Sequence, residues 1–335
     1  MTTDAAQFSI GDLPLEGGGV LRDASMTYQC HGALNEQRDN VVLLPSFMAG
    51  NHEGYQPFIG EGLCFDPSRD FIVAVNLFGN GYSTSPSNAS ARQSGRNFPK
   101  ISIRDNVAGQ HKLLFDHLEV KRVKLVAGYS MGGQQAFQWA VSYPKLVDHL
   151  AVWCAHAVTT PFMRAFLGSV RAGIEGSADW MDGNYRTAAP IAMRNVARIY
   201  APWLLSAGWY DRKGWASLGL ESFEHFIGFV ETLFGAVDAN NFLAKVDTWL
   251  SHDVAATPGH QHSLVSALGG ISAKTLIMSA STDLYFTPAQ SREEASLIGG
   301  ARYRCLETDW GHMAGSGFDP RTFQMINEEI AALLR

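Results

Sequence analysis

Short apolar runs, rich in β-branched and aromatic residues, recur along the chain and are separated by longer stretches with helical spacing. Runs of this length, bounded by turn residues, are typical of strands that are buried on both faces of a sheet. Because such strands alternate with helical stretches, the pattern predicts an α/β protein with a mostly parallel central sheet and helices on both faces. The runs lie at residues 40–44, 71–76, 123–127, 149–153, 275–278 and 302–306.

The intervening stretches show where a helix begins and where the strand pattern stops. Ser102 and Asp105 form a capping box ahead of apolar residues at helical spacing. Between residues 156 and 268 the apolar runs disappear, and the segment is rich in aromatic residues, alanine, methionine and arginine. We therefore predict a core made of residues 1–155 and 269–335, with residues 156–268 inserted as a helical lid over the carboxyl edge of the sheet.

The sequence Gly-Tyr-Ser-Met-Gly at residues 128–132 stands between the apolar run at 123–127 and a helix-like stretch at 133–143. A G-x-S-x-G turn between a strand and a helix is the nucleophile elbow of the α/β-hydrolase fold, in which a sharp turn exposes the serine hydroxyl. The pattern therefore predicts this fold and makes Ser130 the candidate nucleophile. A glycine-rich turn that holds a serine by chance is the simpler alternative, and the flanking strand and helix disfavour it.

A serine nucleophile needs a histidine base and an acid that orients this base, and in this fold they follow in the order serine, acid, histidine. Asp283 comes shortly after the run at 275–278, so we expect it at a strand end, and His312 lies in a later glycine-containing loop. Asp309 is a rival acid, but on the histidine's own loop it would orient the ring less rigidly. Seven other histidines are interpreted as ordinary core or surface residues: His31, His52, His111, His117, His149, His260 and His262.

The oxyanion hole of this fold takes one backbone N–H from the residue after the nucleophile and one from the loop after an earlier strand. The first of these residues is Met131. The earlier strand is the run at 40–44, and the loop at 45–50 contains small residues that let the backbone approach a substrate closely. Phe47 is the expected second donor, and its side chain is expected to be pocket wall.

The similarity to known proteins extends beyond the elbow. The stretch at 128–140, Gly-Tyr-Ser-Met-Gly-Gly-Gln-Gln-Ala-Phe-Gln-Trp-Ala, resembles the elbow and following helix of the homoserine O-acetyltransferase family of α/β-hydrolase-fold acyltransferases. The resemblance covers roughly residues 15–335. Other stretches that carry it are 76–79, 83–86, 98–105, 179–185, 238–243, 283–288 and 311–312.

The resemblance implies an acyltransferase that moves an acyl group, in the first place acetyl, from acyl-CoA to a hydroxyl acceptor through an acyl-enzyme on Ser130. In this interpretation acyl-CoA is a co-substrate, and no cofactor stays bound. The partners are then a small-molecule acyl donor and a hydroxyl acceptor, and a homodimer through the lid is implied as well. Triad residues alone do not separate transfer from hydrolysis, because either an alcohol or water can resolve an acyl-enzyme.

Two departures from the family's pattern bear on the acceptor. Residues 45–49 read Pro-Ser-Phe-Met-Ala where the family usually has His-Ala-Leu-Thr-Gly, so polar side chains are lost. Residues 235–238 read Gly-Ala-Val-Asp, without the arginine that the family usually shows there. Burying the carboxylate of an amino-acid acceptor is costly without a cation or several donors, which argues against homoserine. A carboxylic ester or thioester hydrolase with the same triad is the alternative, and a non-enzymatic binding protein is disfavoured by the intact triad.

Composition excludes several classes of protein. The 335 residues include 26 Lys and Arg and 32 Asp and Glu, which gives a net charge of −6, and no basic run is typical of nucleic-acid binding. There is no apolar stretch of about 18 residues and no signal-like N-terminus, so we expect a cytoplasmic protein. No metal site is expected. The scattered cysteines form no CxxC pattern and are expected to be reduced: Cys30, Cys64, Cys154 and Cys305.

The sequence leaves the substrate-binding residues open. Pockets and cores use the same residue types, so a minority of the lid aromatics is expected to form substrate wall. These aromatics are Trp180, Tyr185, Trp203, Trp215 and Phe242. Candidates for contacting coenzyme A phosphates or an acidic acceptor are Arg164, Arg186, Arg194 and Arg198.

Overall fold

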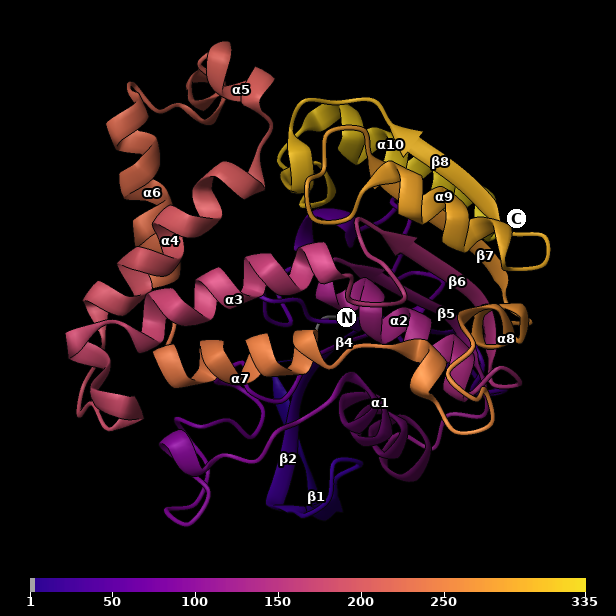
Figure 1. The fold of residues 1–335 in the computed structure, drawn as a ribbon. Coiled ribbons are helices and arrows are strands. Elements are labelled where there is room, and N and C mark those ends of the chain that lie inside the picture. Colours follow the sequence, from indigo (N-terminus) through magenta and orange to yellow (C-terminus); the bar gives the residue numbers. More distant parts are fainter. Residues whose placement is uncertain (1–3) are drawn as a thin grey trace.

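An eight-stranded sheet runs through the residues that the computed structural model describes, 4–335 (Figure 1). The strands lie in the order β1-β2-β4-β3-β5-β6-β7-β8. The pairs β1–β2 and β2–β4 are antiparallel, and all other neighbouring pairs are parallel. The strands are β1 (Ala6–Pro14), β2 (Val20–His31), β3 (Val41–Pro45), β4 (Phe71–Val75), β5 (Val123–Tyr129), β6 (Val147–Trp153), β7 (Lys274–Ala280) and β8 (Arg302–Leu306).

The predicted mostly parallel α/β sheet is confirmed, and the six apolar runs of the sequence correspond to β3–β8. The strands β1 and β2 were not predicted. They form an antiparallel hairpin in which apolar and polar residues alternate, as at Met26, Thr27 and Tyr28 of β2. Such a hairpin contains no continuous apolar run, because only one of its faces is packed against the core.

Alternate residues of the central strands point into two separate cores. In β3, Val41 and Leu43 belong to a core that helices α1 (Ile103–His111), α2 (Met131–Ser142) and α9 (Pro288–Ser296) cover. Val42 and Leu44 belong to the opposite core, which includes Ile326 and Ile330 of helix α10 (Pro320–Leu333). The sheet is thus covered by helices on both faces, as period-2 alternation in a strand requires.

Helix α1 begins at the predicted capping box. The N–H of Asp105 donates to Ser102 Oγ at 3.0 Å, and the N–H of Ser102 donates to Asp105 Oδ2 at 2.8 Å. The α-helix ends at His111 and continues as a π-helical turn over Lys112–His117. This local widening changes the helical spacing that the sequence predicts for the later apolar residues.

The chain between β6 and β7 forms helices and turns, with an isolated bridge between Val158 and Asp253. Figure 1 shows α3 and α7 running side by side, with α4, α5 and α6 on the far side of the molecule from α8. Several of these helices start at a side-chain cap, for example Thr160 before α3 and Asp238 before α7. Their bounds are α3 (Pro161–Glu175), α4 (Pro190–Leu204), α5 (Ala207–Asp211), α6 (Phe223–Gly235), α7 (Ala239–Leu250) and α8 (Leu264–Gly269).

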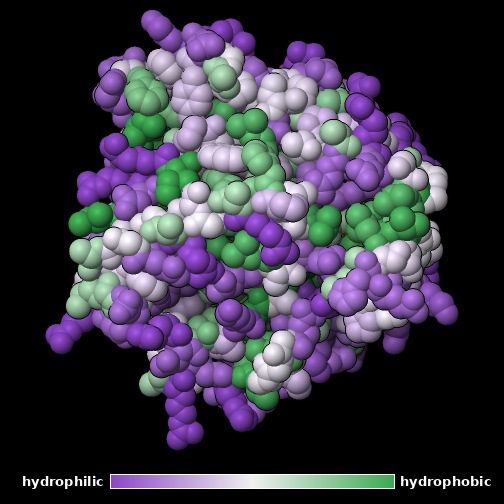
Figure 2. Space-filling view, in the orientation of Figure 1, coloured by the Kyte–Doolittle hydropathy of each residue, from purple (hydrophilic) through white to green (hydrophobic). Residues whose placement is uncertain are grey.

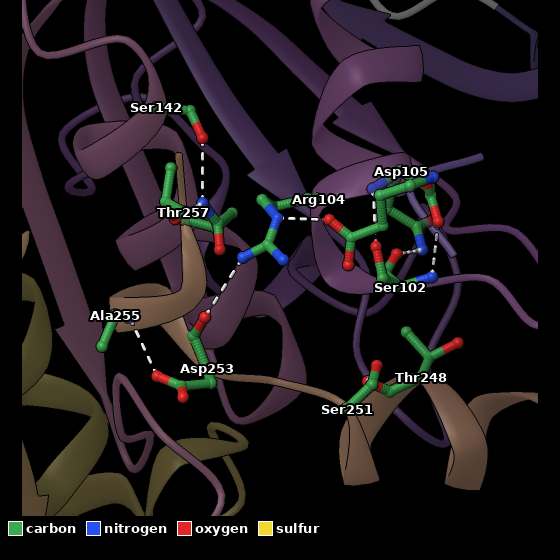
Figure 3. A network of polar contacts seen from close by, with 12 residues as sticks. Ser102, Arg104, Asp105, Ser142, Thr248, Ser251, Asp253, Ala255 and Thr257 are labelled. Carbon is green, nitrogen blue, oxygen red and sulfur yellow. Dashed lines mark hydrogen bonds and ion pairs between the residues drawn. The ribbon is translucent and has the colours of Figure 1, made fainter. Parts of the chain in front are cut away.

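Polar contacts tie the end of this helical segment to the core (Figure 3). Arg104, in the first turn of α1, donates from Nη1 to the Asp253 carbonyl oxygen at 3.2 Å. Gln138 Nε2 of α2 donates to Thr257 Oγ1 at 2.9 Å. The stretch that follows α7 is therefore fixed to two helices of the core.

Hydrophilic side chains cover much of the face drawn in Figure 2, and hydrophobic side chains form small groups among them. Within residues 4–335, no helix has the length and apolar character needed to cross a bilayer. Three of the four cysteines, Cys30, Cys64 and Cys154, are buried, and Cys305 is partly exposed. Their reduced state stays a prediction.

Candidate active site

The candidate site lies at the carboxyl ends of β3 and β5, where the strand order changes direction. The chain leaves β3 toward β4 on one side and returns to β5 on the other. In open α/β sheets, ligands bind at such a switch point, outside the carboxyl ends of the strands. Ser130 stands here, directly between β5 and α2.

The backbone of Ser130 has φ 55° and ψ −127°, a region that residues other than glycine seldom adopt. Close packing makes glycine necessary beside it, because a Cβ on Gly128 would lie 2.3 Å from the backbone of Gly132. The Ser130 N–H donates to the Trp153 carbonyl oxygen of β6 at 3.1 Å. The strained turn is thus held by the sheet and sets the hydroxyl at the N-terminus of α2.

Ser130, Asp283 and His312 come together although they lie far apart in the sequence. His312 Nδ1 is 2.8 Å from Asp283 Oδ2, and His312 Nε2 is 3.0 Å from Ser130 Oγ. When Nδ1–H donates to the carboxylate, Nε2 of the neutral ring accepts from the serine hydroxyl. All three residues are at most 4% exposed. This geometry can generate a serine nucleophile and stabilise the imidazolium that forms.

Both the acid and the base are held by further contacts. Asp283 Oδ1 accepts from the N–H groups of Tyr285 at 2.8 Å and Phe286 at 3.1 Å, which leaves Oδ2 for His312. The rings of Tyr129 and His312 stack with centroids 4.9 Å apart, and the Tyr129 hydroxyl donates to the His312 carbonyl oxygen at 2.9 Å. Burial raises the pKa of Tyr129 well above its usual value, so this hydroxyl stays a donor.

The surroundings of Asp309, the rival acid, and of the nearby thiol of Cys154 disfavour both as members of the site. Asp309 forms an ion pair with Arg212, and it is Asp283 that contacts His312. Among the described residues, no other histidine hydrogen-bonds to Ser130. Cys154 is buried, and burial together with nearby Asp283 raises the pKa of its thiol well above the usual value. It therefore stays a thiol and is a poor nucleophile.

The residues predicted as oxyanion donors flank the elbow. Met131 is the first residue of α2, where N–H groups have no intrahelical acceptor, and Phe47 follows β3 directly after Ser46. The Phe47 N–H has no acceptor within the described part of the chain. The Phe47 ring packs edge-on against Tyr55 and Tyr129, with centroids 5.6 and 5.0 Å away. Both N–H groups can serve an oxygen that develops negative charge.

Tyr55 links the two strands that carry these donors. Its buried hydroxyl donates to the Pro45 carbonyl oxygen at 2.8 Å and accepts from the Tyr129 N–H at 3.1 Å. The paired residues of β3 and β5 end at Leu43 and Val126, so the tyrosine hydroxyl spans the gap where the strands separate. Tyr55 was not predicted from the sequence, because its role depends on a contact between distant segments.

A cavity of about 940 Å³ opens above Ser130 and His312. Its far wall is apolar and comes from α4 and α6, including Leu204, Phe226 and Val230. Polar residues of the wall are few and include Asn51, Asn80, Asp238, Asn241 and Lys245. A mostly apolar cavity with a few polar groups is typical of a site for a small organic substrate.

The lid residues singled out from the sequence lie outside this cavity. None of the five aromatics forms part of its described wall; Phe242 belongs to the hydrophobic core, and the other four are partly buried and pack against it. The four candidate arginines are absent from the described wall as well, and Arg198 instead pairs with Glu231. The aromatic wall residues are others, such as Phe226, Phe229 and Tyr285. Sequence alone does not separate these from core residues, because both kinds follow helical spacing.

The cavity wall contains a cation, Lys245, that was not predicted from the sequence. Residues 235–238 contain no positive charge, but Lys245 enters the cavity wall almost two turns further along α7. Apolar neighbours at Phe242 and Val246 give a local signal that this lysine is buried. Within residues 4–335, no group of three or more His, Cys, Asp or Glu side chains could hold a metal ion.

Comparison with known proteins agrees with this geometry. The model of the family described as alpha/beta hydrolase fold matches residues 39–316, which is most of the chain and includes all three residues of the triad. The chain belongs to the α/β-hydrolase family. Within it, the similarity extends to homoserine O-acetyltransferases, as the sequence predicted: that of Nostoc punctiforme is 31% identical over 317 residues, which cover 90% of this chain and 88% of the relative.

Esterases of this family are also similar over almost the whole length. The ethyl acetate hydrolase of Pseudomonas veronii is 34% identical over 332 residues, covering 97% of this chain and 94% of the relative. The crystal structure of an acetylester hydrolase from Corynebacterium glutamicum has a TM-score of 0.96 and 32% identity, and the match covers 98% of this chain and 95% of that one. The α/β-hydrolase described here is therefore an enzyme of the esterase or acyltransferase type.

Proposed function

We propose that this α/β-hydrolase is a carboxylic ester hydrolase that acts on acetyl or similarly short acyl esters. The observation that carries the proposal is the hydrogen-bonded series of Ser130, His312 and Asp283 at the base of a solvent-accessible apolar cavity. Two of the similar proteins are named as hydrolases of acetyl esters, and each match extends over more than nine tenths of both chains. These two proteins support hydrolysis better than acyl transfer. Hydrolysis was the alternative prediction from the sequence, and acyl transfer was the main one.

The mechanism follows from the geometry. Ser130 Oγ attacks the ester carbonyl carbon while His312 Nε2, 3.0 Å away, takes its proton. The backbone N–H groups of Met131 and Phe47 hold the oxyanion, and Asp283 stabilises the imidazolium. Collapse of the tetrahedral species expels the alcohol, which receives the proton from His312. Water then attacks the acyl-enzyme by the same steps and releases the acid.

The mouth of the cavity supports water as the acceptor. Phe229, Leu233 and Phe318 line the cavity and are nevertheless 37%, 50% and 54% exposed, so its rim opens to solvent. A transferase has to keep water from its acyl-enzyme while an alcohol is positioned. The cavity wall is apolar at Phe47 and Met48, so an acceptor alcohol would find few hydrogen-bond partners there.

Acyl transfer from acyl-CoA to a hydroxyl acceptor is the second candidate, and the homoserine O-acetyltransferase relative favours it. None of the four arginines considered for coenzyme A phosphates lies in the described cavity wall. The homodimer implied by the resemblance stays a prediction.

Acetate release from ethyl acetate and from an aryl acetate tests the proposal. We expect turnover without any added alcohol, and loss of turnover in Ser130→Ala. Ser169→Ala on the exposed side of α3 is the matched control and should keep wild-type rates. Thiol release from acetyl-CoA that depends on homoserine or another alcohol, with negligible ester hydrolysis, would instead establish the transferase.

A further inference from the structure

Helix α7 carries a buried lysine to the loop that follows β3. Lys245 is 2% exposed and lines the same cavity as Ser130, and its Nζ donates to the Met48 carbonyl oxygen at 2.6 Å. Burial lowers the pKa of Lys245 to about 8, an effect that Asp238, at the start of the same helix, partly offsets. Its Nζ also lies 5.6 Å from the centroid of the Phe242 ring. Placing an ammonium group here is costly, so its contact with the loop needs an explanation.

The contact falls on the loop that bears the second oxyanion donor. Met48 is the residue after Phe47. On the other side of Phe47, the Ser46 N–H donates to the Val75 carbonyl oxygen at 2.9 Å, and the Ser46 carbonyl accepts from Gln135 Nε2 at 2.8 Å. The backbone is therefore fixed on both sides of Phe47. Ser46 is held by β4 and α2 on one side, and Met48 is held by Lys245 on the other. Charge-assisted hydrogen bonds such as that of Lys245 are among the strong ones in proteins.

The helix that carries Lys245 is itself fixed to the core. Thr248 Oγ1, less than one turn beyond Lys245, donates to the Ile101 carbonyl oxygen at 2.8 Å. The contact of Arg104 with the Asp253 carbonyl oxygen holds the chain just after the helix (Figure 3). Lys245 thus reaches the loop from a rigid base, which is what a positioning group requires.

We propose that Lys245 is a positioning residue for ester hydrolysis, which holds the Met48 carbonyl and thereby keeps the Phe47 N–H directed at the oxyanion. The proposal rests on the proposed function. It makes the rate of the chemical step depend on how α7 is seated against the loop after β3. Lys245 itself touches no reacting atom in this account, and the neutral amine and the ammonium can both donate to Met48.

The test compares Lys245→Met, which keeps most of the side-chain volume and removes the donor, with wild type on an aryl acetate. Removing an oxyanion donor lowers kcat by about 10²–10³-fold in other enzymes, so a displaced donor should lower it by about tenfold to 10²-fold. We expect KM to change little, and the affinity for a trifluoromethyl ketone inhibitor, which forms the oxyanion, to fall by a factor similar to that in kcat. Asp247→Asn, on the same helix as Lys245, is the matched control. It removes an ion pair with Arg171 of α3 and should keep kcat.

Chemical rescue separates positioning from a general loosening of the fold. Lys245→Ala should regain part of its kcat with added ethylamine or propylamine, whereas Lys245→Met, whose side chain fills the space, should not. If Lys245→Met does not fold, Lys245→Ala with and without amine decides the question. Wild-type kcat in a folded variant without the donor would overturn the proposal, as would a loss of kcat that no amine restores. An inactive wild type would instead refute the proposed function.

Discussion

Gly132→Ala tests whether the packing between the elbow and the oxyanion loop controls catalysis. A Cβ at residue 132 would lie 2.3 Å from the Pro45 carbonyl oxygen and 2.4 Å from the Tyr55 hydroxyl. Neither neighbour can swing aside freely, because one is backbone at the end of β3 and the other is a buried hydroxyl with two hydrogen bonds. The added methyl group must therefore push the end of β3, and with it Phe47, away from the elbow.

The close contacts at residue 132 determine how much stability and how much kcat the variant should lose. Overpacking of a tight core costs about 1–3 kcal/mol, and the rigid neighbours place Gly132→Ala in the upper part of this range. Displacement of the Phe47 N–H should lower kcat toward the loss of about 10²–10³-fold that removal of one oxyanion donor causes. KM should change much less, because the far apolar wall of the cavity comes from α4 and α6.

The assay combines urea unfolding with kcat and KM for an aryl acetate. Gly168→Ala on α3 is the matched control, since a Cβ there would meet no atom within 4 Å. We expect this control to keep kcat and to gain about 0.4–1 kcal/mol, because alanine restricts the unfolded chain more than glycine does. A Gly132→Ala protein with wild-type stability and kcat would refute the reasoning.

Three further predictions concern other buried polar groups. Tyr55→Phe leaves the Pro45 carbonyl and the Tyr129 N–H unpaired, so urea unfolding should show a loss of about 1–3 kcal/mol, accompanied by a lower kcat. Asp283→Asn should lower kcat by about 10⁴-fold while thermal unfolding stays near wild type, because the amide favours the wrong tautomer of His312. Burial raises the pKa of Glu294 to about 8, so its contribution to stability is present below its usual pKa and is lost as the pH rises toward 8. Glu294→Gln should therefore be more stable than wild type above about pH 8, by an amount that shrinks toward pH 5, and a difference independent of pH would contradict this.

The sequence predicted the parts of the fold and site whose determinants are local. The parallel strands are continuous apolar runs because both their faces are buried. The elbow is recognisable from the sequence because its close packing requires glycines on both sides of Ser130, within five residues. The order of the triad in this fold then led to Asp283 and His312, which the structure places within hydrogen-bonding distance.

The residues that escaped prediction depend on contacts between distant segments. Tyr55 acts between β3 and β5, and Lys245 reaches Met48 across almost two hundred positions of sequence. The cavity wall also escaped, because Phe226 of α6 lines it and Trp215, only eleven residues earlier, does not. Both are aromatic residues of the same helical segment, and only their packing distinguishes them.

The fate of the acetyl group on Ser130 tests the central claim most directly. Rapid-quench mass spectrometry of the protein with an aryl acetate, in ¹⁸O-labelled water and in the presence of homoserine, follows the acyl-enzyme and both of its products. The account predicts an acetyl adduct on Ser130 that decays to acetate carrying ¹⁸O, with no acetylated homoserine. Decay into acetylated homoserine in place of labelled acetate would contradict it and make the protein an acyltransferase.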